Sequence, residues 1–438
     1  MTPEFFAKIF SVLISMIGLV FPMTAQIQNS VSKTESVPAQ VQSCDWNFIG
    51  GNTDLGLSDR NATYYFHWGE AKSGEKLIFK AQFPHARYMS LVVYDQKGLI
   101  IDSLGDVDIV PTKGTNPFRP KTRRDKENLG DFKIEIKAEA LPSTNRPSNT
   151  LYVGATRDGK PNGLFLLAYR LYVPDKKFSL SAKHPLAVSG GVPNPELVYL
   201  NKQNQSYCQE KERIQELRRL NADTVVSQTE GKTSIPGATE VFNPPFWSHT
   251  SREARRDLAL GPNDDTIYAA AQISSRFGEL LVLRWRAGKS PIETYEGKSF
   301  QKPDKYDLRY WSLSFSYKHP TEKSWGGVRT EKTVADFEAP VLPDGTRQIV
   351  VGFNGMKRPE AVPPEQWVGL QMKEGSVLVR YVLPSQQWEG DLGKYPKDVF
   401  PGNAQQFVPG GVYCSAKDFA ADPNIGLRSV LTTPKKAK

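Results

Sequence analysis

The amino-acid sequence predicts an all-β protein made of two tandem jelly-roll or sandwich-like modules with a short bridging helix. Three observations support this fold class. Short apolar or alternating segments recur along most of the chain, the 34 glycines and 32 prolines provide frequent turns, and one series of segments occurs twice. Many short strands separated by turn residues are typical of sandwiches and jelly rolls.

The internal repeat is the strongest of these signals. Arg87 to Tyr94 (RYMSLVVY) matches Arg309 to Ser316 (RYWSLSFS). Further matches, in chain order, are 61–64 with 265–268, 74–78 with 278–282, 146–147 with 358–359, and 166–174 with 377–384. Because the order is kept throughout, we infer a duplicated module. The main change in spacing indicates an insertion around 290–307 in the second copy, which we expect to be a surface loop.

Each copy is expected to fold as a run of short strands. The expected strands are 76–83, 87–94, 132–137 and 164–172 in the first copy, and 280–285, 310–317, 348–353 and 377–383 in the second. They are rich in Val, Ile, Leu and aromatic residues, and Gly, Pro, Asn or Asp bounds them.

The amino terminus has the order of a secretory signal peptide. A short polar stretch leads into the apolar run Ile9 to Phe21, followed by Pro22 to Ala25, after which we expect cleavage. The run is shorter than the roughly 18 to 20 residues that a membrane span needs. We therefore expect an exported protein, periplasmic or extracellular, with no transmembrane anchor in its mature chain.

The expected organisation follows from the signal peptide and the repeat. It is a signal peptide at 1–25, a flexible segment at 26–43, the first module at 44–175, a linker at 176–240, the second module at 241–415 and a tail at 416–438. In the linker, Ile214, Leu217 and Leu220 lie three residues apart among charges. This spacing predicts an amphipathic helix from Glu210 to Leu220.

Charge and cysteine content limit the partners. The formal net charge is +9, but the cations are dispersed apart from 121–124 and the carboxyl-terminal lysines. We therefore expect no nucleic-acid binding, and affinity for an anionic surface or an acidic polysaccharide fits better. The three cysteines are Cys44, Cys208 and Cys414. Export permits one disulfide, which we expect between Cys208 and Cys414 because they flank the second module.

Patterns for several common sites are missing. The three Gly-Lys-Ser/Thr triplets lack the upstream glycine of a phosphate loop. Asp102, Asp106 and Asp108 lack the glycine and terminal glutamate of a helical calcium loop. The histidines are isolated in sequence, at His67, His85, His184, His249 and His319. We therefore expect no metal and no cofactor, and assign no catalytic residue.

Two segments of the second copy resemble those of a known group of proteins. Gly261 to Tyr268 (GPNDDTIY) and Leu308 to Leu313 (LRYWSL) resemble exported bacterial proteins with paired β domains of unknown function. In the first copy the resemblance lies in 85–90, 114–118 and 169–175. It implies the two-module architecture over most of 44–415 but no activity, since that family has no assigned reaction. Ser314 stands where related sequences are expected to carry Cys, so no disulfide pattern is carried over.

A repeated pair of arginines is the main candidate for a ligand site. Arg87 and Arg170 in the first copy match Arg309 and Arg380 in the second. An arginine in a partly buried strand needs a carboxylate, a carbonyl or an anionic ligand, and the alternative is a structural ion pair or a stacked aromatic ring. We expect structural roles for Arg170 and Arg380, in central strands, and a ligand-binding role for at least one of Arg87 and Arg309.

Further candidate ligand-binding residues lie beside these arginines or on nearby strands. They are Tyr88, Tyr310, Trp311, His67 and Asp265. Aromatic residues can stack on sugar rings, although core packing is their commoner use. Asp265 follows another aspartate, but adjacent residues on a strand face opposite sides.

The sequence therefore predicts an exported two-module protein that binds a carbohydrate or a small anionic or aromatic ligand in the cell envelope. The alternative is an envelope enzyme of the lyase, isomerase or hydrolase class, with an arginine and tyrosine site in one module.

Overall fold

The computed structural model describes residues 47–50, 58–74, 76–119, 122, 129–179, 182, 184–200, 241–255, 262–299, 305–318 and 328–427. All of them belong to the compact unit Val41–Lys438. The expected signal peptide, the segment 26–43 and the expected helix at 210–220 lie outside the described residues, as do Cys44 and Cys208.

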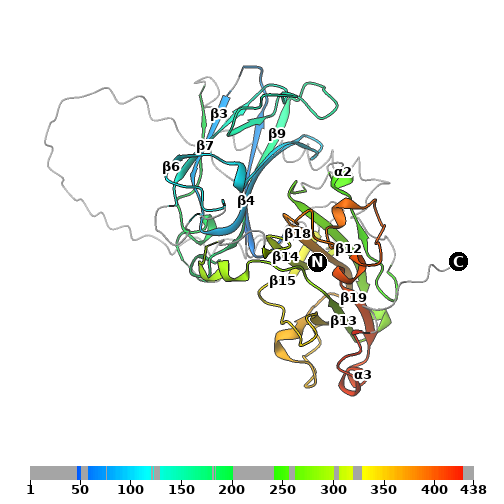
Figure 1. Cartoon of the computed structure of the whole chain (residues 1–438). Helices are drawn as coiled ribbons and strands as arrows, with labels where there is room; N and C mark the ends of the chain where they lie inside the picture. Colours follow the sequence, from blue (N-terminus) through cyan, green and yellow to red (C-terminus); the bar gives the residue numbers. More distant parts are fainter. Residues whose placement is uncertain are drawn as a thin grey trace, which may run out of the picture. The chain divides into compact units, whose positions relative to one another are not determined.

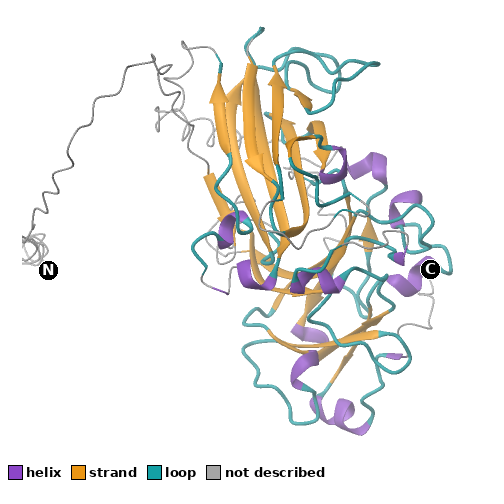
Figure 2. Cartoon of the chain, turned by 60° about the vertical axis from the view of Figure 1, so that its left-hand side comes forward, coloured by secondary structure: helices purple, strands orange, loops and turns teal. Residues whose placement is uncertain are grey.

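Two β-sheets form the framework of the first module (Figures 1 and 2). Its five-stranded antiparallel sheet has the order β1 (Asn47–Gly50), β2 (Ala62–Glu70), β9 (Leu164–Pro174), β4 (Ala86–Asp95), β5 (Ile100–Gly105). Its second sheet has the order β10 (Glu196–Tyr199), β3 (Lys76–Gln82), β7 (Asp131–Lys137), β6 (Pro111–Lys113), with β8 (Thr150–Tyr152) parallel to β7. Side chains from both sheets, among them Phe79, Met89 and Leu167, form one core.

The second module repeats this arrangement. One sheet has the order β11 (Ser248–His249), β12 (Thr266–Ser274), β18 (Glu374–Val382), β14 (Tyr310–Lys318), β15 (Val328–Ala335). The other has the order β17 (Trp367–Gly369), β16 (Arg347–Gly352), β13 (Leu280–Trp285), β19 (Gly410–Cys414). Their core includes Trp285, Trp311 and Val379. The predicted all-β fold class with sandwich-like modules is confirmed.

The helices of the described chain are short. The α-helices are α2 (Arg252–Arg255) and α3 (Ala416–Ala421). The 3-10 helices are η2 (Asp106–Asp108), η3 (Lys176–Phe178), η5 (Ala187–Ser189), η7 (Ser275–Phe277), η8 (Ile292–Glu296), η11 (Pro364–Gln366), η12 (Leu392–Lys394) and η13 (Ala404–Phe407).

Strand order and register identify equivalent residues in the two modules. The order β1-β2-β9-β4-β5 corresponds strand by strand to β11-β12-β18-β14-β15. Arg170 of β9 and Arg380 of β18 lie at the same register between their neighbouring strands. Counted from this register, Arg87 of β4 is equivalent to Arg309, which directly precedes β14.

The module boundaries differ from those expected in two places. β10 pairs with β3, so the first module takes a strand from the segment 176–240 that we expected to be linker. At the other end, α3 begins with a capping box between Ser415 and Asp418 and buries Phe419 in an apolar cluster on β13 and β16. The expected tail 416–438 therefore starts as packed structure. A four-residue strand and a six-residue helix have too little periodicity to be recognised in the sequence.

Candidate functional site

The sheet β1-β2-β9-β4-β5 of the first module and the sheet β11-β12-β18-β14-β15 of the second pack against each other through the faces that turn away from their own cores. In β4, Met89 and Leu91 point into the first module, whereas Tyr88 lies in a cluster with Tyr310 and Val382 of the second. This alternation follows from the strand period of two. All ten residues of β4 are therefore buried.

Each module provides the carboxylate for the other module's arginine. The Arg87 guanidinium donates through Nη1 to Asp336 Oδ1 at 2.7 Å, and the Arg309 Nη1 donates to Asp106 Oδ2 at 3.0 Å. Asp106 and Asp336 are themselves equivalent, because each directly follows the last residue of β5 or β15. The two ion pairs are thus reciprocal, and both join the modules.

The tyrosines beside these arginines make a second reciprocal pair of contacts. The Tyr88 hydroxyl donates to Asp265 Oδ2 at 2.8 Å and lies 3.1 Å from Asn263 Oδ1, while the Tyr310 hydroxyl donates to Asp59 Oδ2 at 3.1 Å. Burial raises the pKa of both tyrosines well above the usual value, and the nearby aspartates add to this. Both side chains remain neutral hydrogen-bond donors at any ordinary pH.

Several sequence-predicted ligand residues are therefore used inside the protein. Arg87, Tyr88, Tyr310 and Trp311 have no exposed surface, so the structure places them where a ligand does not reach. This corrects the expectation that they form a ligand site. Trp311 packs edge-on against Trp285 in the core of the second module, with the ring centroids 5.4 Å apart.

His67 and Asp265 also have internal partners. The His67 Nε2 lies 2.9 Å from the Tyr199 hydroxyl in the first module, and burial lowers the pKa of His67 to about 4. Asp265 is half-buried and accepts the hydrogen bond of Tyr88 across the interface. Neither residue lines the cavity described below.

Arg170 and Arg380 lie between the β1-β2-β9-β4-β5 sheet and the β11-β12-β18-β14-β15 sheet. Because both belong to central strands, we expected structural roles for them. Arg170 Nη2 donates to the Tyr94 hydroxyl at 2.5 Å, and its guanidinium carbon lies 5.5 Å from the centre of that ring. Arg380 Nη1 donates to Ser314 Oγ at 2.6 Å. Each residue is 3% exposed. These contacts support structural roles for both.

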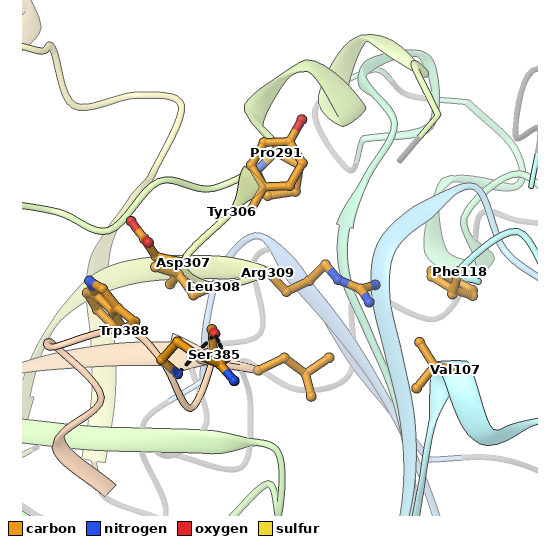
Figure 3. Close-up of a pocket in the computed structure, with 11 residues that line it drawn as sticks. Val107, Phe118, Pro291, Tyr306, Asp307, Leu308, Arg309, Ser385 and Trp388 are labelled. Atoms are coloured by element: carbon orange, nitrogen blue, oxygen red, sulfur yellow. Dashed lines mark hydrogen bonds between the residues drawn. The ribbon is translucent and has the colours of Figure 1, made fainter. Parts of the chain in front are cut away.

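Arg309 differs from the other three arginines because it lines a cavity of about 510 Å³ (Figure 3). Its side chain is 14% exposed, whereas that of Arg87 is fully buried. Figure 3 shows it extending from the start of β14 toward Phe118 and Val107 of the first module. The remaining lining residues are Pro291, Tyr306, Asp307, Leu308, Leu383, Ser385, Gln387 and Trp388.

The cavity walls combine aromatic rings with ordered polar groups. The Asp307 carboxylate accepts a hydrogen bond from the Lys289 amide at 2.7 Å, and Ser385 Oγ donates to Gln387 at 2.6 Å. The Tyr306 hydroxyl donates to Glu293, and burial together with this carboxylate raises the pKa of Tyr306 to about 12. Among the described lining residues, Arg309 is the only cation.

Asp106 lies behind Arg309 and has no exposed surface. Burial raises the pKa of Asp106 to about 7; the Arg309 charge opposes this shift and the Asp265 carboxylate adds to it. Our sequence reasoning considered Asp106 only as a calcium ligand, and it missed Asp336. Alignment of the repeat through the ends of β5 and β15 would have revealed both as a matched pair.

The described residues contain no group of three or more His, Cys, Asp or Glu that could hold a metal ion. Within that part of the chain, no helix is long and apolar enough to cross a membrane. Cys414 is buried and has no disulfide partner among the described residues, which do not include the predicted partner Cys208.

Comparison with known proteins gives only distant likenesses. No family model matches the chain, and no curated protein does. An uncharacterized protein from Burkholderia cenocepacia is 11% identical with a TM-score of 0.48, over 79% of this chain and 80% of that chain. A protein from Vibrio parahaemolyticus is 11% identical with a TM-score of 0.41, over 77% and 88%. The vicilin from Solanum melongena is 10% identical with a TM-score of 0.17, over 79% and 81%.

At these values the comparisons assign neither a family nor a ligand. The resemblance to exported proteins with paired β domains stays a prediction.

Proposed function

We propose that the protein binds a small ligand, a carbohydrate or an anionic or aromatic molecule, in the cavity beside Arg309, and that it does so as an exported protein of the cell envelope. The observation that carries this proposal is the cavity itself. Its volume of about 510 Å³ lies within the range of roughly 300 to 1,000 Å³ that is usual for small-molecule sites.

The chemistry of the lining supports this ligand class. Tyr306 is half-buried and supplies a ring surface on which a sugar or an aromatic ring can stack, while the buried Phe118 and Trp388 add apolar wall. Arg309, Ser385 and Gln387 supply hydrogen-bonding groups. An apolar wall with a few oriented polar groups is the usual design of a small-molecule site.

The alternative, an enzyme of the lyase, isomerase or hydrolase class, has one observation in its favour. The pKa of Asp106 is about 7, which suits general acid–base catalysis. Its side chain, however, has no exposed surface and is absent from the cavity lining, so it does not meet a substrate there. We therefore prefer binding.

Calorimetric titration of the mature chain with neutral sugars, uronic acids and aromatic acids tests the proposal. We expect at least one of these to bind, and Tyr306→Ala and Gln387→Ala to weaken that binding about tenfold or more, since each removes a wall of the cavity. Phe246→Ala is the matched control, because Phe246 is 44% exposed and lies outside the cavity. Equal losses in all three variants, or no binding of any class, would overturn the proposal.

A further inference from the structure

We infer that the ligand of this cavity carries a carboxylate on a sugar or aromatic ring, and that its binding at Arg309 is coupled to the uptake of one proton by Asp106. The inference rests on the proposed function and specifies the ligand class of the same site.

The Arg309 side chain connects the cavity to the buried interface. On the buried side, its Nη1 lies 3.0 Å from Asp106 Oδ2 and 3.1 Å from the Arg87 carbonyl oxygen. On the other side, it forms part of the cavity wall. The carboxylate of Asp307, the only anion among the described lining residues, already accepts a hydrogen bond from the Lys289 amide. An incoming carboxylate therefore finds its opposite charge at Arg309.

Asp106 is an unusually poor counter-ion for that arginine. Its Oδ2 accepts from Arg309 and, at 3.4 Å, from the Met89 amide, and the Val107 amide also favours the ionised form, but its Oδ1 is buried without a well-formed hydrogen bond among the described residues. An ionised carboxylate with an unsatisfied buried oxygen pays a desolvation cost that a protonated one avoids.

Other titratable groups near Asp106 reinforce this effect. Asp265, just before β12, and Asp108 of η2 approach the Gly105 that precedes Asp106. Tyr88 of β4 interacts electrostatically with Asp106 and keeps its proton, since its pKa is far above neutral. Arg309 is therefore the cation that stabilises ionised Asp106, and Asp265 opposes ionisation. The pKa of Asp106 of about 7 is consistent with this geometry.

The coupling follows from charge balance. While Asp106 is ionised, it neutralises Arg309, and an anionic ligand gains little from the pair. Once Asp106 takes up a proton from solvent, its negative charge no longer offsets the charge of Arg309, and the ligand's carboxylate gains more from the arginine. By reciprocity, a ligand carboxylate that forms an ion pair with Arg309 raises the pKa of Asp106 still further. Binding is therefore tighter below the folded-state pKa and weaker above it.

Isothermal titration of the mature chain at pH 6 and pH 8 tests the inference. The probes are glucuronate against glucose, and benzoate against benzyl alcohol, so that the charge and the type of ring are varied separately. We expect at least one carboxylate to bind about fivefold or more tightly at pH 6 than at pH 8. Its neutral analogue should bind more weakly and without this pH dependence. Titrations near pH 7 in two buffers of different ionisation enthalpy should show net proton uptake with the carboxylate alone.

Two variants separate Asp106 from other carboxylates. Asp106→Asn mimics the protonated side chain, so it should keep the tight binding at both pH values and lose the proton uptake. Asp102→Asn is the matched control, because Asp102 is also buried and pairs with an arginine, Arg146, at 2.8 Å. It should retain both effects.

The outcomes distinguish this inference from the proposed function. Binding of a neutral probe with no preference for its carboxylate analogue, or carboxylate binding without proton uptake by the wild-type chain, overturns the inference and leaves the proposed function standing. Uptake that persists in Asp106→Asn also overturns it. Absence of binding by these four probes and by the neutral sugars, uronic acids and aromatic acids above overturns both. The wild-type buffer titrations decide the question even where a variant does not fold.

Discussion

Arg87 and Arg309 occupy equivalent positions in the two modules and pair with equivalent aspartates, yet their surroundings differ. The Arg87 side chain is fully buried, and its Nε donates to Thr294 Oγ1 at 2.8 Å in addition to the ion pair with Asp336. Arg309 is 14% exposed and lines the cavity. Equivalent sequence motifs therefore do not guarantee equivalent roles, because what covers each side chain comes from elsewhere in the chain.

The length of one loop explains this difference. In the second module the insertion between β13 and β14 folds into η8, which packs against β4 and provides Thr294 to Arg87. The segment around 290–307, expected as a surface loop, thus also covers Arg87. In the first module only Phe83 to His85 connect β3 with β4. This connection is too short to cover Arg309 in the same way, and Phe118 and Val107 form the opposite wall of the cavity instead.

The largest expected contrast is between alanine substitutions of the two arginines. Arg87→Ala leaves the fully buried Asp336 without its cation, and the free energy of unfolding should fall by roughly 3 to 5 kcal/mol. Arg309→Ala should lower it by less, about 1 to 2 kcal/mol at pH 6, because Asp106 takes up a proton. Urea denaturation of both variants measures the contrast. Equal losses would show that the two positions are energetically alike.

A smaller contrast separates the two aspartates. The folded-state pKa of Asp106 is raised to about 7, above its unfolded value, so its ionisation destabilises the fold progressively between about pH 4 and pH 7. Asp106→Asn should therefore stabilise the protein at pH 8, by about 1 kcal/mol or more, and change little at pH 4. Asp336→Asn should destabilise it at pH 8, because Arg87 loses its charged partner. Melting curves at both pH values test this, and a destabilised Asp106→Asn at pH 8 would contradict it.

The smallest expected contrast concerns the insertion. Thr294→Val keeps the shape of the side chain but removes the acceptor for Arg87 Nε, and should cost about 1 kcal/mol. Ser385→Ala, on the cavity side, removes a half-exposed hydroxyl and should change stability by less than about 0.5 kcal/mol. If the two losses measured by urea denaturation agree within error, η8 does not stabilise the Arg87 end.

The strands and their duplication could be predicted from the sequence, but the contacts between the two modules could not. The match of RYMSL with RYWSL placed Arg87 and Arg309 correctly as equivalents, because alternation and turn residues are local signals. Their partners Asp106 and Asp336 lie in the other module, and no local pattern encodes that contact. One signal was available: both faces of β4 carry large side chains, as in a strand with no face in water.

The cavity was beyond sequence reasoning for a related reason. Phe118, Tyr306 and Trp388 come from three separate loops, and none lies in a repeated motif. Loop residues that converge on a site leave no periodic pattern, so only the folded arrangement brings them together.

Arg87 and Tyr88 bind aspartates of the second module, and the equivalent Arg309 and Tyr310 bind aspartates of the first. This is the pattern of an isologous twofold interface, as in a homodimer, but within one chain. In a homodimer every substitution appears at both ends of the interface, so a cavity opened at one end is opened at the other. Fusion of the two halves removes that constraint. An insertion in one half covers Arg87 through Thr294 and lines the cavity beside Arg309 through Pro291, Tyr306 and Asp307, so one added segment makes the two ends of the interface different.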